Sequence, residues 1–393
     1  MAPWLSAAGA GRGGAGGRSR APKGEESEMN ALIAVLLCFA LLGAVDKMLN
    51  GVLGVAPAFD QGLASMGPLC LSMAGIYCAA VAVLGGNPEA VAAVGEALPF
   101  DPSVLAGALL APDMGGYAIA TQLAQDRQVG AYSAILVTST LGTLVSFALP
   151  ISLGALPAHE TGGFMQGVLW GILSLPLGLL LGGLILGMGP AQLLGGLWPV
   201  CVVCLALCAG LRFAPRGCLV AMNALGQLVR VGGIVLMCIV TAGVFVPEWA
   251  LVDPALVSEV LGVVLRITAV VCGSLVATTL LMSRAGRLLR RAAGALRVNE
   301  YAVVGLLASL ANSISMLPLY SRMDVRGKVM NAAFTVSGAF CFGGQLAFVA
   351  AVADGRQVGA FMAAKLLAGA AAVCLALKFT RGEQAEVPAE QTA

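Results

Sequence analysis

The sequence predicts an all-α, polytopic integral membrane protein. Hydrophobic residues make up 59% of the 393 residues and charged residues 11%, whereas charged residues form about 25% of a typical soluble domain. Residues 129–158 and 161–211 contain no charged residue, and each run is long enough for a membrane-spanning helix of about 20 residues. The 52 glycines and 18 prolines suit membrane helices that pack closely through small residues.

The chain divides into a membrane domain and two polar ends. Residues 1–28 are rich in Gly, Ala and Arg without apolar periodicity, so we expect a disordered extension, or one upstream of a natural start at Met29. The membrane domain covers residues 29–380, and residues 381–393 form a polar tail. Residues 217–229 are expected to lie along the membrane surface. Apolar runs predict spans at residues 29–49, 61–84, 129–158, 164–188, 193–211, 231–246, 267–282, 329–352 and 361–379. With two interrupted stretches, this gives about 10 or 11 membrane-embedded helical segments.

The first interrupted stretch is residues 106–121, AGALLAPDMGGYAIAT. It places Asp113 after Pro112 and before Gly115 and Gly116, and these neighbours weaken a helix on both sides of the carboxylate. A carboxylate in a broken helix inside a bilayer is costly unless it is used. The stretch is therefore a candidate site for a cation or a polar substrate, and a polar contact between helices is the alternative reading.

Charge distribution predicts a second interrupted stretch. The positive-inside rule places a short arginine-rich connection in the cytoplasm; its members are Arg284, Arg287, Arg290, Arg291 and Arg297. Three simple spans after it would leave the C-terminal tail outside, together with Arg322, Arg326 and Lys328. A re-entrant pair of half-helices at residues 298–321 removes this conflict. Its apolar run is interrupted by polar residues and a proline, namely Ser309, Asn312, Ser313, Ser315 and Pro318.

The two stretches match each other at a constant offset of 198 residues. Five identical pairs share this offset: Gly107 and Gly305, Leu109 and Leu307, Asp126 and Asp324, Ala134 and Ala332, and Ser139 and Ser337. With one inserted residue, Asp113 corresponds to Asn312. Chance matches are common in a chain rich in Ala, Gly and Leu, so a two-repeat architecture is a hypothesis. Paired broken helices from two repeats meet near the midplane in many secondary transporters.

Other functional classes find little support. One histidine, His159, in a short polar connection supplies neither a metal site nor a catalytic triad, and no GxxxxGK[ST] loop is present. Cys201, Cys204 and Cys208 recur at helical spacing without His or acid beside them, which favours packing. We therefore expect no enzyme activity, metal, cofactor or nucleic-acid partner. The expected partners are a small-molecule substrate and membrane lipids, and the sequence leaves open whether the chain forms a homo-oligomer.

Three segments resemble the ethanolamine utilization permease family: GAVDKML at residues 43–49, GALLAPDMGGYAIA at 107–120 and SLANSISMLPLYSRMDVRGKVMNAAFTVSGAF at 309–340. The resemblance covers residues 29–381 and implies uptake of ethanolamine across the cytoplasmic (inner) membrane. The chain departs from the family pattern at Gly344 and Gln345, where the family shows an Asp-His pair, so a charge or proton role there is in doubt. It also has Ser313 and Ser315 where a second Asn and a Pro are usual.

Ethanolamine, an amine that is mostly protonated near neutral pH, requires a carboxylate or carbonyls for its ammonium and a polar partner for its hydroxyl. We expect Asp113, in the loop loosened by Gly115 and Gly116, to meet the ammonium. The hydroxyl partner is expected among Asn312, Ser313 and Ser315. Tyr117 offers a ring face to the cation, although ordinary packing is the favoured reading.

Two further acidic positions have other expected roles. Asp324, Arg326 and Lys328 are read as a cytoplasmic gate or a topological lock. Asp46 is either a polar anchor near a helix end or a substrate contact. A passive channel or facilitator for small amines, and a non-transporting scaffold for the ethanolamine-degrading machinery, remain as alternative functions, and the coupling ion is left open.

Overall fold

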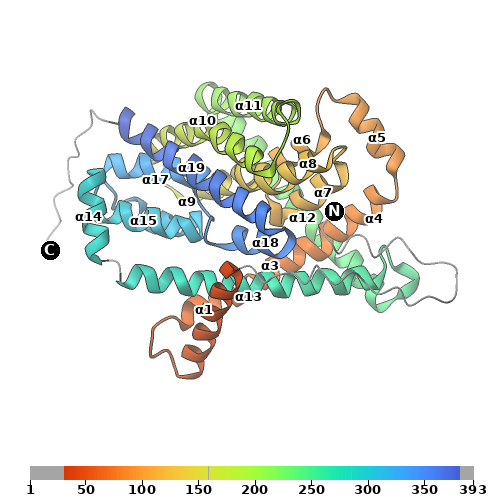
Figure 1. Ribbon diagram of the computed structural model, residues 1–393, viewed down its shortest axis with the longest axis horizontal. Helices are drawn as coiled ribbons and strands as arrows, with labels where there is room; N and C mark the ends of the chain where they lie inside the picture. Colours follow the sequence, from red (N-terminus) through yellow and green to blue (C-terminus); the bar gives the residue numbers. More distant parts are fainter. Residues whose placement is uncertain (1–30, 158, 285, 381–393) are drawn as a thin grey trace.

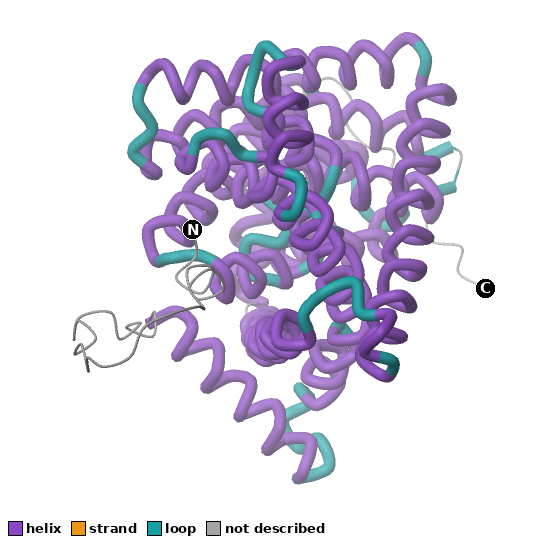
Figure 2. The backbone as a smooth tube through the Cα atoms, turned by 90° about the vertical axis from the view of Figure 1, so that its right-hand side faces the viewer, coloured by secondary structure: helices purple, strands orange, loops and turns teal. Residues whose placement is uncertain are grey.

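Helices form all the regular structure of this protein in a computed structural model that describes residues 31–157, 159–284 and 286–380. No strand occurs within these ranges (Figure 2). The all-α prediction is confirmed. The N-terminal extension expected at residues 1–28 and the tail at residues 381–393 lie outside the described residues.

The helices follow one another with short connections, and η denotes 3₁₀- or π-helical turns. The elements are α1 (Ala31–Met48), α2 (Ala56–Ala64), α3 (Met66–Cys70), η2 (Leu71–Tyr77), α4 (Cys78–Gly85), α5 (Pro88–Ala97), α6 (Pro102–Leu109), η3 (Pro112–Met114), α7 (Gly116–Leu123), α8 (Arg127–Ala131), η4 (Tyr132–Gly142), η5 (Leu144–Ala148), α9 (Leu149–Ala155), α10 (Thr161–Leu186), α11 (Pro190–Phe213), α12 (Pro215–Phe245), η6 (Pro247–Trp249), α13 (Pro254–Arg284), α14 (Gly286–Leu296), α15 (Glu300–Ala311), η7 (Ser313–Met316), α16 (Leu317–Tyr320), α17 (Val325–Ser337), α18 (Gly344–Val352) and α19 (Gly355–Phe379).

Seven helical stretches in the described chain are long and apolar enough to cross a membrane. They are residues Ala56–Gly85, Arg127–Ala155, Thr161–Leu186, Pro190–Phe213, Pro215–Phe245, Pro254–Leu281 and Gly355–Phe379. Two predictions are wrong here. The span expected at residues 329–352 is broken between α17, which ends at Ser337, and α18, which begins at Gly344. In addition, α12 is a single helix of 31 residues, not a surface segment followed by a short span. Arg230 does not end the helix, because its side chain stays exposed and bonds Gln227 one turn earlier. Likewise, α13 begins at Pro254, well before the predicted residue 267.

The first interrupted stretch forms a re-entrant hairpin, which we call hairpin 1 (α6, η3 and α7). Asp101 closes its base. One carboxylate oxygen caps the start of α6 through the Ser103 N–H at 2.9 Å, and the other accepts the N–H groups of Gln125 and Asp126 at 3.0 and 3.1 Å. Residues 101 and 126 therefore lie side by side although the hairpin runs between them. Asp126 in turn caps α8; the Val129 N–H is the main cause that holds the pKa of this carboxyl below its usual range.

Residues 299–324 form a second re-entrant hairpin, hairpin 2 (α15, η7 and α16). Asn299 caps α15 through the Ala302 N–H, and its own N–H donates to Asp324 Oδ1 at 2.9 Å. The side-chain amide of Asn299 also donates to the Arg322 carbonyl at 2.8 Å. The two ends of the hairpin therefore meet, as the charge distribution predicted for residues 298–321.

The two halves repeat the same contacts at the offset of 198 residues. Asp101 and Asn299 occupy equivalent capping positions at the hairpin bases. A Cβ added at Gly107 would lie 2.8 Å from the Ser133 carbonyl, and one at the equivalent Gly305 would lie 2.8 Å from Asn331 Oδ1. Each hairpin therefore packs on the helical segment that follows it in its own half, which supports the two-repeat hypothesis.

The two halves meet where α10 packs against α19 and α17 (Figure 1). Small residues make this approach possible, because a Cβ at Gly178 or Gly171 would meet backbone carbonyls of α19 or α17. This is the close packing through small side chains that membrane helices use. At the periphery, α1 crosses the long helix α13 and projects from the body (Figure 1).

Replacing Asp101 by Ala is expected to destabilise the protein by about 2 kcal/mol, because it removes a helix cap and leaves the N–H groups at the hairpin 1 base without their acceptor. Chemical unfolding in detergent measures this. Asp101→Asn, which keeps a capping oxygen as in Asn299, should lose less. Asp253→Ala is the matched control, since that exposed carboxylate bonds only the Ala255 N–H. Equal losses for Asp101→Ala and Asp253→Ala would contradict the role in closing the hairpin.

Candidate functional site

The interruption of hairpin 1 presents Asp113 in the single turn η3 between α6 and α7. Gly115 follows with φ of +88°, a left-handed conformation that side chains rarely adopt. A Cβ at Gly116 would collide with the Leu110 carbonyl. Both glycines are therefore required for the chain to turn tightly behind the carboxylate. Asp113 is partly buried and forms no ion pair with any described residue.

Tyr117 lies one turn further along, on α7, and it is buried. Its ring meets the Phe348 ring edge to face at 5.4 Å, and its hydroxyl donates to the Val352 carbonyl at 3.4 Å. Both partners belong to α18, in the other half of the molecule. These contacts favour a packing role for Tyr117, and they place hairpin 1 against α18.

The interruption of hairpin 2 begins at Asn312, whose side-chain oxygen accepts the Ile314 N–H at 3.0 Å and so starts the turn η7. Ser313 is fully buried, and its hydroxyl has no hydrogen-bond partner in the described structure. The same holds for Ser309, whereas Ser315 is exposed. The interruption therefore offers buried hydroxyl groups that are free to bind a further polar group.

Each interruption packs against a break or bend in the helical segment that follows it. In the first half, Gly142 lies so close to the Leu110 carbonyl that a Cβ would clash with it, and the Ala111 N–H donates to Ser146 Oγ at 3.0 Å. In the second half, the Phe340 N–H donates to the Ser309 carbonyl at 3.0 Å. Residues 142 and 340 are again 198 apart. Within the described residues, no hydrogen bond joins Asp113 directly to hairpin 2.

Asp46 proves to be an anchor. Its carboxylate is buried and accepts the N–H groups of Leu53, Val55 and Ala56 at 2.6, 2.8 and 2.9 Å. These bonds use the carboxylate to hold the turn between α1 and α2. Of the two roles that the sequence left open, the structure therefore favours the anchor.

The cluster of Asp324, Arg326 and Lys328 lies at the start of α17, beside the base of hairpin 2. Arg326 Nε donates to the Leu296 carbonyl at 3.2 Å. Lys328 pairs with Glu160 at 2.7 Å, and Glu160 also accepts the Ser321 hydroxyl at 3.0 Å. Sequence analysis did not single out Glu160, although it could have been noticed as an isolated acidic residue between two charge-free segments.

Replacing Glu160 by Gln is expected to destabilise the protein by about 2 kcal/mol, because it leaves the partly buried Lys328 ammonium without its carboxylate. The double variant Glu160→Gln with Lys328→Met should recover part of the loss, since it removes both charges. Chemical unfolding in detergent gives the four values of the double-variant cycle. Strictly additive effects would show that the pair does not interact.

A second buried charge also escaped sequence analysis. Lys365 lies in the middle of α19 with 2% of its surface exposed, and it contacts Gln345, the position at which the family pattern is not kept. The available signal was a lysine near the start of the predicted span at residues 361–379, well before Lys378 at its end.

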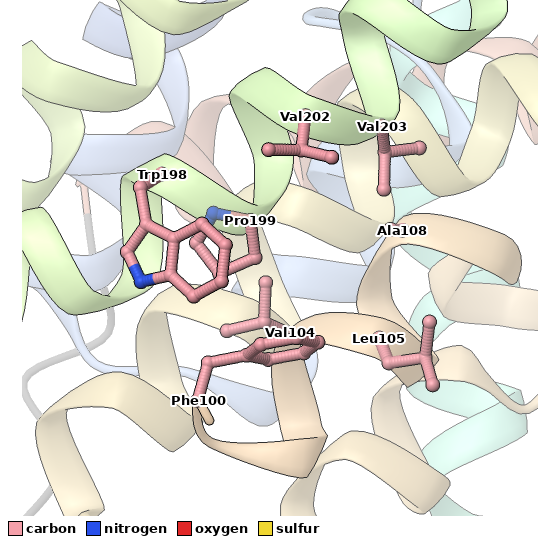
Figure 3. A pocket seen from close by; sticks show the side chains of 8 residues that line it. All are labelled: Phe100, Val104, Leu105, Ala108, Trp198, Pro199, Val202 and Val203. Atoms are coloured by element: carbon pink, nitrogen blue, oxygen red, sulfur yellow. The ribbon is translucent and has the colours of Figure 1, made fainter. Parts of the chain in front are cut away.

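An apolar cavity of about 100 Å³ lies elsewhere, between α6 and α11 (Figure 3). Phe100 and Trp198 line one side of it, and their rings meet edge to face with centroids 5.5 Å apart. Its remaining lining is also apolar: Val104, Leu105, Ala108, Pro199, Val202 and Val203. A small cation with a hydroxyl group would find no polar partner there, so this cavity is not the candidate site.

Two interrupted helical hairpins, packed among helices that are long and apolar enough to cross a membrane, indicate a multi-pass membrane protein. A family model described as "Ethanolamine utilisation protein, EutH" matches residues 29–379. The chain belongs to this family, and the resemblance seen in its motifs is confirmed.

Relatives match over nearly their whole length. The chain is 32% identical to "Probable ethanolamine permease EutH" of Listeria monocytogenes over 88% of this chain and 92% of the relative. It is 28% identical to the protein of the same name from Salmonella typhimurium, over 92% and 98% of the two chains. It is 31% identical to "Uncharacterized protein YxeR" of Bacillus subtilis, over 91% and 96%. No solved structure gives a significant match. The permease names of the Listeria and Salmonella relatives support a role in transport.

Proposed function

We propose that this protein is an ethanolamine permease of the cytoplasmic membrane. The main support is the family membership over residues 29–379 together with one structural observation: a carboxylate that pairs with no cation of the described residues lies at the interruption of hairpin 1. In a low-dielectric interior a cationic ligand stabilises such a carboxylate strongly, because the attraction between opposite charges is stronger there than in water. Ethanolamine supplies a compact ammonium of this kind.

The proposed binding mode divides the substrate between the two interruptions. Asp113 receives the ammonium in the turn formed by Gly115 and Gly116. The hydroxyl bonds to hairpin 2, where the buried Ser313 hydroxyl has no hydrogen-bond partner among the described residues and Asn312 starts the turn. Ser315 is exposed and Tyr117 is engaged by α18, so both are weaker candidates. Simultaneous contact with both hairpins would couple substrate binding to their relative movement.

The base of hairpin 2 is proposed as the cytoplasmic gate. Asp324 accepts a hydrogen bond that joins the two ends of the hairpin. Arg326 donates to a carbonyl at the end of α14, and Lys328 forms an ion pair with Glu160. Exposed arginines beside it, Arg284, Arg291 and Arg297, fit the cytoplasmic side under the positive-inside rule. Opening this gate would require several of these bonds to break together.

Reconstitution in liposomes tests the function. Labelled ethanolamine uptake is measured with no gradient, with an imposed proton gradient and with an imposed sodium gradient. A coupled carrier accelerates under one gradient, whereas a facilitator carries flux that neither gradient accelerates. Protein-free liposomes are the control, because the uncharged amine crosses lipid unaided. Binding of the ethanolamine-degrading enzymes without any flux would instead identify a scaffold and overturn the proposal.

A further inference from the structure

Lys365 is a buried amine between the two halves of the molecule. Its Nζ donates to the Ser139 carbonyl at 2.7 Å and to Gln345 Oε1 at 2.6 Å. The rings of Phe340 and Phe361 lie 5.9 and 5.6 Å from Nζ. No carboxylate of the described chain pairs with it. An amide oxygen, a carbonyl oxygen and two aromatic rings therefore surround this amine. A buried lysine is normally paired with an acidic side chain.

The Lys365 contacts lead to both hairpin interruptions. Gln345 Nε2 donates to Thr143 Oγ1 at 2.6 Å. Thr143 follows Gly142, whose backbone packs on the Leu110 carbonyl at the end of α6. On the other side, Phe340 beneath the amine donates its N–H to hairpin 2. Lys365 is thus connected to the interruption of hairpin 1 through the side chains of Gln345 and Thr143, and to that of hairpin 2 through Phe340.

The immediate oxygen acceptors suit either protonation state of this amine. A lysine ammonium has three N–H donors, while the neutral amine has two donors and a lone pair. Two oxygens accept from Nζ here, which satisfies both donors of the neutral amine. The third N–H group of the ammonium has no oxygen acceptor among these contacts. The faces of the two aromatic rings compensate for part of this missing hydrogen bond. A small change in the surrounding charge can therefore decide whether the proton stays.

Titratable groups on the elements packed against α19 are few. Neither α10 nor α18 contains one, and η4 contributes Tyr132, which is buried beside α11 cysteines. The connection between α17 and α18 brings the buried Cys341 thiol toward the amine. Arg326 and Lys328 lie in the first turn of α17, and both are cationic. None of these groups supplies a neutralising negative charge near neutral pH.

We propose that protonated Lys365 and a cationic substrate at the hairpin interruptions exclude one another, so that substrate binding releases the Lys365 proton. In this step an N–H bond of the ammonium breaks, its electron pair remains on Nζ, and the proton passes to water on the side to which the site is open. Lys365 carries the same primary ammonium as ethanolamine, so the protein contains its own competitor for the region around Asp113. This inference rests on the proposed amine transport.

The test compares apparent affinity for labelled ethanolamine in proteoliposomes between about pH 5 and pH 8, where this amine remains mostly protonated. Wild-type affinity should weaken as pH falls, by roughly tenfold, the order of magnitude expected for repulsion between two like charges at an effective dielectric of about 20. Lys365→Gln should lose this part of the pH dependence and bind as wild type does at high pH. Asp113 adds its own pH dependence to both proteins, so the difference between the two profiles is the quantity measured.

Two further variants separate charge from structure. Lys365→Arg keeps a permanent charge and should bind weakly at every pH. Gln345→Glu keeps the lysine and places a carboxylate of the same shape against it, which neutralises the site and should bind as Lys365→Gln does. In weakly buffered detergent solution, adding ethanolamine to wild type should acidify the medium by up to about one proton per site, and Lys365→Gln should abolish this release.

The outcomes distinguish the two proposals. If wild type transports ethanolamine but Lys365→Gln and Gln345→Glu keep the wild-type pH profile, or no proton is released on binding, the role of Lys365 is overturned and the transport function stands. If wild type neither binds nor transports ethanolamine, the proposed function fails, and the inference about Lys365 fails with it.

Discussion

Asp113→Asn is expected to reduce ethanolamine uptake at limiting concentration by roughly tenfold to a hundredfold. Asparagine has nearly the same shape but no charge, and a hydrogen bond to a charged group contributes about 1.5–3 kcal/mol. The turn around Asp113 should survive, because Gly115 and Gly116 form it with backbone geometry. Initial uptake rates in proteoliposomes, normalised to the amount of inserted protein, measure the effect.

The matched control is Asp60→Asn. Asp60 is an exposed carboxylate of α2 that pairs with Lys47 at the surface, and an exposed pair of this kind contributes little to stability. Uptake by Asp60→Asn should equal that of wild type. Unchanged uptake by properly inserted Asp113→Asn would remove the proposed contact with the ammonium and favour the reading of Asp113 as a polar contact between helices.

Adding a methyl group at Gly142 or Gly343 is expected to destabilise the protein by about 1–3 kcal/mol or more and to impair uptake together. A Cβ at Gly142 would collide with the Leu110 carbonyl, and one at Gly343 with the Ala311 carbonyl. Both collisions involve backbone at a hairpin interruption, which cannot move aside as a flexible side chain does. Unfolding in detergent and uptake in liposomes check the two effects.

Gly359→Ala provides the comparison. Gly359 lies within α19, and a Cβ there meets nothing within 4 Å. Alanine favours a helix over glycine by up to about 1 kcal/mol, so this variant should be at least as stable as wild type and equally active. If Gly142→Ala and Gly343→Ala behave like Gly359→Ala, the close approach of each hairpin to the following helical segment is not required.

Much of the architecture could be predicted because it depends on local composition. Apolar runs long enough to cross a bilayer predicted most of the spans. The arginines of residues 284–297 predicted hairpin 2, because simple spans after them would place later basic residues outside the cytoplasm. The same reasoning failed at α12. There, Arg216 and Arg230 suggested a surface segment, but a helix of 31 residues accommodates charged side chains at exposed positions without ending.

The sequence alone predicted only some residues of the candidate site and its surroundings. Asp113 was visible because proline and glycine flank it. Glu160 and Lys365 were not, since their significance lies in partners that are 168 residues away for the Lys328 ion pair and 226 for the Ser139 carbonyl. No periodicity or motif encodes such a pairing when a single chain is read alone.

The sequence by itself predicted a membrane protein whose helices break at two positions, with a carboxylate at the first break, and it suggested that the two positions are related. These follow from hydropathy, from local backbone preferences and from a repeat along the chain. Only the tertiary structure decided that Asp46 is an anchor, that Glu160 pairs with Lys328 and that Lys365 lies between the two halves of the molecule with no ion-pair partner among the described carboxylates. Burial and neighbouring charge set the chemistry of an ionisable group, and both are created when distant segments pack together.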